Sequence, residues 1–132
     1  MFLSGFNYNE KCAFYSLAKR IAESDENISK NEVNLLNQYL DEMRLCIEQI
    51  TDIKENDAVD IFLNSSNRVR KQVFIELFAL TLCDNEFARE EAELISHYAN
   101  YLHIPEQDQE KMRACVLDLL QVYSRMNSLV EE

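Results

Sequence analysis

The stretch DNEFAREEAELISHYANYL, residues 84–102, is a second version of DENISKNEVNLLNQYLDEM, residues 25–43, displaced by 59 positions. Four of the 19 aligned pairs are identical, namely Asp25 with Asp84, Glu32 with Glu91, Leu35 with Leu94, and Tyr39 with Tyr98. In both copies, apolar residues recur at helical steps of three and four. A repeat of this kind indicates a duplicated supersecondary unit. The sequence therefore predicts two pseudo-symmetric helical hairpins, with repeat halves at about 9–43 and 66–102.

Helix-start signals agree with this division. Asn9 is expected to cap the first helix, and SKNE at 29–32 matches a capping box. In such a box the Ser29 hydroxyl accepts from the Glu32 amide, while the Glu32 carboxylate accepts from the Ser29 amide. The run FIELFALTLC, 74–83, is apolar nearly all round and predicts the buried centre of the fold.

Two further helices are expected outside the repeat. A brief one is predicted near 59–63, between the halves, and a final one over about 105–127, with Pro105 in its first turn. The final helix has apolar residues at helical spacing: Met112, Cys115, Val116, Leu119, Leu120, Tyr123 and Met126. No linker composition separates these segments. The sequence thus predicts one all-α domain over 1–132, with about seven helices in a compact bundle.

Composition supports the same class. The 132 residues include one glycine and one proline, so turn-rich β architectures lack the residues they need. No stretch approaches 18 apolar residues, and the N-terminus MFLSGFNYNEK lacks the pattern of a signal peptide, so we expect a cytoplasmic protein without direct membrane insertion. The four cysteines form no C-x-x-C pair, and we expect them to be free, buried thiols.

The formal charge of −11 disfavours binding to nucleic acids or to anionic membranes. Binding to a phosphate backbone requires clustered Lys and Arg side chains that displace counterions. The densest basic cluster is the short set Arg68, Arg70 and Lys71, which we interpret as a solvated helix start. No nucleic-acid partner is expected.

The two loop segments carry a motif that resembles a known family. Asp-x-x-(Ile/Phe)-x-x-x-Glu-x-x-Leu occurs twice, from Asp25 and from Asp84, preceded by LAKRIAESD and LFALTLCD. This pattern is similar to the TerB-like domain of tellurite-resistance proteins, found also at the N-terminus of the DjlA membrane co-chaperone. Glu26 and Asn85 stand where the family pattern has glycine. The resemblance implies an all-helical fold of about seven helices, carboxylates around two loops, and a link to bacterial stress response.

Two interpretations of the paired acids Asp25, Glu32, Asp84 and Glu91 stay open. Each Asp can accept backbone N–H groups in its loop, with the glutamate completing a helix cap. Alternatively, the four carboxylates can hold a divalent cation such as calcium, which prefers six to eight oxygen ligands. Neither segment is an EF-hand, because position twelve of each is Leu36 or Ile95 instead of glutamate.

Catalytic signals are weak, and a non-enzymatic protein is expected. His97 and His103 are six residues apart and do not share a helix face, and one glycine excludes a Gly-rich phosphate loop. Aromatic residues offer another role, because some can line a groove for a partner helix. Tyr101 lies off the main apolar stripe of its helix. The sequence therefore favours an acidic module that binds an unidentified protein partner.

Overall fold

The computed structural model describes residues 1–24, 27–83 and 89–132, and over these ranges it holds six α-helices, two 3-10 turns and no strand. The predicted all-α class is confirmed, with six α-helices where about seven were expected. The elements in chain order are η1 (Leu3–Gly5), α1 (Tyr8–Glu23), α2 (Lys30–Met43), η2 (Ile47–Gln49), α3 (Glu55–Leu63), α4 (Asn67–Thr81), α5 (Arg89–Tyr101) and α6 (Glu106–Glu131).

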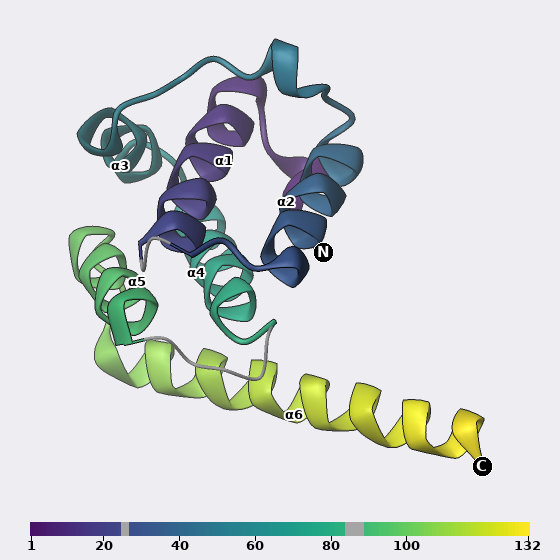
Figure 1. The fold of residues 1–132 in the computed structure, drawn as a ribbon. Helices are drawn as coiled ribbons and strands as arrows, with labels where there is room; N and C mark the ends of the chain where they lie inside the picture. Colours follow the sequence, from purple (N-terminus) through teal and green to yellow (C-terminus); the bar gives the residue numbers. More distant parts are fainter. Residues whose placement is uncertain (25–26, 84–88) are drawn as a thin grey trace.

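The 59-residue offset extends from the loops to both helices of each hairpin. The N-cap residues of α1 and α4, Asn7 and Ser66, are 59 positions apart, and the residues of positive φ that follow α2 and α5, Arg44 and His103, are also 59 apart. Side chains at equivalent positions are buried alike: Leu36 and Ile95, Tyr39 and Tyr98, and Met43 and Leu102. The α1–α2 and α4–α5 hairpins are thus two versions of one unit (Figure 1).

The start of α1 differs from the prediction. Asn7, not Asn9, is the cap: its Oδ1 accepts from the Glu10 amide at 2.9 Å, and Glu10 Oε1 accepts from the Asn7 amide at 2.9 Å. Asn9 lies inside the first turn and is exposed. Asn7 is selected because Glu10, three residues later, can complete the reciprocal pair. The predicted box of Ser29 and Glu32 is confirmed, with hydrogen bonds of 3.0 and 3.1 Å.

The core is shared by the first helices of the two hairpins. α1 contacts α2, α3, α4 and α5, while α4 contacts α5 and α6 (Figure 1). α1 contains nine buried residues and α4 seven, so α1 is at least as central as the apolar run in α4 that was expected to form the centre. Phe14 of α1 packs edge-on against Tyr39 of α2, with ring centroids 5.0 Å apart.

α6 differs from the other helices because only its first part packs on the body. Gln109 and Val116 are buried, and Met112 packs against the core. Every residue from Leu117 onward is exposed. Figure 1 shows this second part extending past the other helices to the C-terminus. The final helix was expected over about 105–127; it runs to Glu131, and Pro105 occupies its N-cap position.

Candidate functional site

The first candidate is the set of four acids, of which the structure describes two. Glu32 and Glu91 lie in the first turns of α2 and α5 and are only 2% and 4% exposed. Asp25 and Asp84 lie outside the described residues. The proximity of all four carboxylates, which a shared cation would require, therefore stays a prediction.

The capping box of α2 uses only one of the two carboxylate oxygens of Glu32. Its Oε1 accepts the Ser29 amide, whereas its Oε2 is buried and has no hydrogen-bond partner within the described part of the chain. The helix N-terminus favours a negative charge at this position. A buried carboxylate oxygen without a partner is costly and requires an explanation. A cation could meet this oxygen, although among the described residues no three His, Cys, Asp or Glu side chains gather as metal ligands do.

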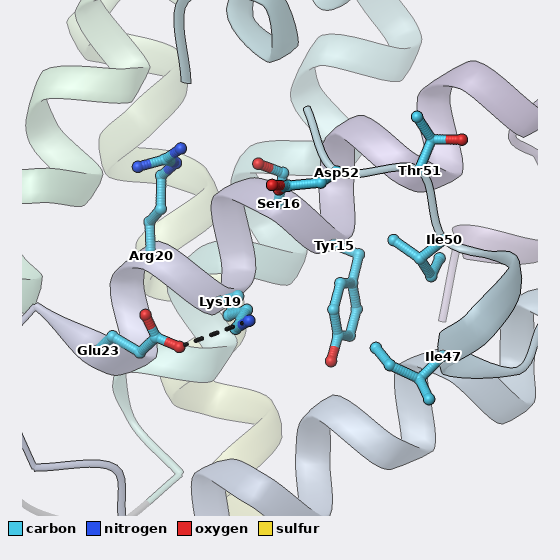
Figure 2. Close-up of a pocket in the computed structure, with 9 residues that line it drawn as sticks. All are labelled: Tyr15, Ser16, Lys19, Arg20, Glu23, Ile47, Ile50, Thr51 and Asp52. Carbon is cyan, nitrogen blue, oxygen red and sulfur yellow. Dashed lines mark ion pairs between the residues drawn. The ribbon is translucent and has the colours of Figure 1, made fainter. Parts of the chain in front are cut away.

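The second candidate is a hollow of about 320 Å³ between α1 and the segment that holds η2 (Figure 2). Its α1 wall is Tyr15, Ser16, Lys19, Arg20 and Glu23, and its other wall is Ile47, Ile50, Thr51 and Asp52. Hydrogen bonds hold the second wall against α1. The Ser16 hydroxyl donates to the Ile53 carbonyl at 2.5 Å, and the Tyr8 hydroxyl donates to the Gln49 carbonyl at 2.5 Å.

Three side chains on the α1 wall of this hollow, Tyr15, Ser16 and Lys19, make structural interactions. Lys19 pairs with Glu23 at 3.9 Å, and both side chains are about half exposed, so their attraction is screened by water. Burial and the nearby Glu23 raise the pKa of the Tyr15 hydroxyl, which keeps it protonated at neutral pH. Ser16 already donates its proton to a backbone carbonyl. Neither Tyr15 nor Ser16 is therefore an activated nucleophile.

Other residues singled out from the sequence are partly corrected. The expectation of four buried thiols is wrong, because only Cys12 is buried; Cys83 is half-buried, and Cys46 and Cys115 are exposed. Cys46 lies at the N-cap of η2, outside any long helix. Tyr101 is 52% exposed, as its place off the main apolar stripe of its helix suggests. Its ring stands edge-on to that of His97, with ring centroids 4.4 Å apart.

The third candidate is the exposed face of α6. Eight of the 14 exposed large hydrophobic side chains among the described residues belong to this one helix. Seven of them lie within one half of the helix circumference, with Leu129 and Leu120 at its two edges, and we call them the α6 stripe: Leu119, Leu120, Val122, Tyr123, Met126, Leu129 and Val130. The eighth, Leu117, lies about 180° from Met126 around the helix. An apolar set concentrated in this way marks an interaction surface more often than scattered residues do.

The α6 stripe continues the face that packs on the body. Val116, Tyr123 and Val130 follow one another at seven-residue steps, and Val116 is 5% exposed while Val130 is 84% exposed. The periodicity correctly predicted the helix but not that its second half lies outside the core. One signal was available: the helix expected over about 105–127 would already span about 35 Å, which exceeds the roughly 30 Å of a small domain.

Comparison with known proteins adds no relative to this picture. No protein-family model, curated protein or solved structure matches the chain. Within the described ranges, none of the helices, α6 included, combines the length and hydropathy required to span a bilayer.

Proposed function

We propose that this protein is a non-enzymatic, acidic interaction module that binds a partner protein through the α6 stripe. The observation that carries the proposal is the exposure of seven apolar side chains on one half of a helix whose earlier turns pack on the body through Gln109, Met112 and Val116. Leaving such a face in water forgoes roughly 25 cal/mol per Å² of apolar surface, which a partner can recover. In the hollow between α1 and η2, the protonated Tyr15 and the hydrogen-bonded Ser16 support the non-enzymatic part of the proposal.

The α6 stripe indicates what kind of partner fits. A band of apolar side chains that includes three- and four-residue spacings suits a second helix with an apolar face, which inserts its side chains between those of the first. A lipid surface fits less well, because interfacial helices carry many Lys and Arg on their polar side, whereas Arg125 is the one basic residue from Leu117 onward. We therefore assign a helical protein segment as the partner.

We also propose a relationship to the TerB-like proteins and a role in bacterial stress response. The twofold Asp-x-x-(Ile/Phe)-x-x-x-Glu-x-x-Leu motif supports this relationship. The equal offset between the N-caps of α1 and α4 is compatible with it. The stress-response role rests on that resemblance alone.

Site-specific photo-crosslinking tests the interaction function. A photoreactive phenylalanine analogue at Tyr123 should form a discrete protein adduct in cells of the source organism, because Tyr123 lies in the α6 stripe and is 53% exposed. The same analogue at Gln121, about 160° away around the helix and also exposed, is the matched control. Adducts at neither position, or equally at both, would contradict the proposal.

A second function, binding of a divalent cation such as calcium, is favoured by the unpaired Oε2 of Glu32. The full ligand set proposed is Asp25, Glu32, Asp84 and Glu91. Calcium tolerates irregular geometry and prefers carboxylate oxygens, so it could use an oxygen that the helix cap leaves over.

A further inference from the structure

We infer that the partner of the α6 stripe is the α6 helix of a second copy of this chain, packed antiparallel to the first. This inference rests on the proposed interaction function and specifies its partner. Three features of α6 carry it: the charge of the exposed segment, the placement of its two charged residues, and the symmetry of the resulting pair.

Most of the exposed part of α6 carries few charged residues. Residues 114–130 hold one acidic residue, Asp118, and one basic residue, Arg125, before Glu131 and Glu132 at the tip, whereas the whole chain carries a formal charge of −11. Two copies of so acidic a protein repel one another over most of their surface. The α6 segment is a place where two copies can meet without that repulsion, and it is also where the apolar side chains gather.

Asp118 and Arg125 have a spacing that matches itself in an antiparallel pair. They are seven residues apart, about two turns, and therefore lie on the same side of the helix, along the edge of the stripe formed by Val122 and Leu129. When two α6 helices are centred between Gln121 and Val122, Asp118 of each copy comes opposite Arg125 of the other. A parallel pair in register would instead place the two copies of this edge on opposite sides of the pair, so that Asp118 and Arg125 would not meet.

The antiparallel pair is also closed by symmetry. A twofold axis through the centre makes both copies use the same surface, so the assembly ends at two chains and does not grow into a filament. The second part of α6, exposed from Leu117 onward, extends past the other helices in each copy (Figure 1). In this register residues 117–126 of the two helices, all of them exposed, lie opposite one another, and the helices must cross at an angle because Val116 of each copy packs on its own body.

Sedimentation analysis with charge-reversal variants tests this inference. Over about a hundredfold range of concentration, the mass should rise from 15.5 kDa toward twice that value. Asp118→Arg and Arg125→Asp should each weaken the dimer at least about tenfold, because each places like charges opposite one another. The combined Asp118→Arg, Arg125→Asp variant should restore the original affinity, since the pairs re-form with opposite polarity.

Two apolar variants locate the interface. Met126→Glu, inside the α6 stripe, should abolish the dimer, whereas Leu117→Glu, on the opposite side of the same helix, should leave it intact. Circular dichroism of each variant confirms that the helices have formed. A mass of 15.5 kDa at every concentration would overturn the inference, as would a dimer that survives Met126→Glu or a combined charge variant that stays monomeric.

Failure of this inference can be told apart from failure of the proposed function. If the chain stays monomeric but Tyr123 crosslinks to a protein of another mass, the interaction function holds and the second copy is the wrong partner. If the chain is monomeric and Tyr123 forms no adduct, both are overturned.

Discussion

At the scale of single residues, the two oxygens of the Glu32 carboxylate separate a helix-capping role from a proposed metal-binding role. One carboxylate oxygen completes the cap of α2, and the other is buried without a partner in the described part of the chain. A cap alone explains the first oxygen and not the second. The cation hypothesis explains both, because a metal bound at Oε2 leaves Oε1 free for the Ser29 amide.

Glu32→Gln distinguishes the two roles. The amide oxygen can still accept the Ser29 N–H, so stability without metal should change by no more than about 1 kcal/mol. If calcium binds, it should raise the melting temperature of the native chain and not that of Glu32→Gln, because the amide cannot supply the charged ligand. Differential scanning fluorimetry after chelator treatment measures both.

Ser29→Ala is the matched control for this comparison. It removes the other half of the capping box at a cost of about 1 kcal/mol but keeps the carboxylate, so its calcium response should equal that of the native chain. No calcium response in the native chain, or equal responses in native and Glu32→Gln proteins, would remove the support for a cation site at Glu32.

At the scale of helices, the sequence predicted where helices begin better than it predicted which helix faces are buried. The starts of α2 and α4 follow from local caps at Ser29 and Ser66, which a short window of sequence contains. The choice between Asn7 and Asn9 for α1 was also local, and Glu10 decides it. The exposure of the second half of α6 could not be predicted in this way, because burial depends on where distant helices end.

The C-terminal ends of α2 and α5 show a further equivalence that the sequence comparison did not include. Arg44 and His103, 59 positions apart, have positive φ angles of 58° and 57°. In both places the next backbone amide donates a hydrogen bond of 3.1 Å to the carbonyl five residues earlier, from Leu45 to Leu40 and from Ile104 to Ala99. This is the pattern of a helix end at which glycine is usually preferred.

Arg44→Gly and His103→Gly should therefore each stabilise the protein. A non-glycine residue in the left-handed region carries a cost of roughly 1–2 kcal/mol, and part of the gain is offset by the greater freedom of glycine in the unfolded chain. The expected net gain is about 0.5 kcal/mol per site, measured as a higher urea midpoint at unchanged slope. Arg44→Ala is the control, because it removes the exposed side chain but keeps the strained backbone. A gain in Arg44→Ala as large as that in Arg44→Gly would show that the backbone angle is not the cause.

At the scale of the whole molecule, the repeat places two buried tyrosines in equivalent helices. The Tyr39 hydroxyl donates to the Glu76 carbonyl at 3.1 Å, and the Tyr98 hydroxyl donates to Glu55 Oε2 at 2.9 Å. The identity of Tyr39 and Tyr98 was visible in the aligned sequences, but their hydroxyl partners were not, because those partners come from α4 and α3. Burial raises the pKa of both hydroxyls above 10.0, and nearby glutamates, Glu76 and Glu55, raise it further.

These raised pKa values predict a loss of stability in alkaline solution. The folded state keeps the two protons at a pH where the unfolded chain releases them, so the contribution is complete below pH 10.0 and is lost as the pH rises above it. Each such tyrosine should lower the free energy of unfolding by about 1.4 kcal/mol per pH unit in that range. Urea unfolding at a series of pH values, with reductant to protect the free cysteines, measures the slope.

Tyr98→Phe should cost about 1 kcal/mol at neutral pH and make the alkaline slope shallower by that same 1.4 kcal/mol per unit. A slope for Tyr98→Phe identical to that of the native chain would contradict the prediction. It would mean that Tyr98 ionises as readily in the folded protein as in the unfolded one, despite its burial and its hydrogen bond to Glu55.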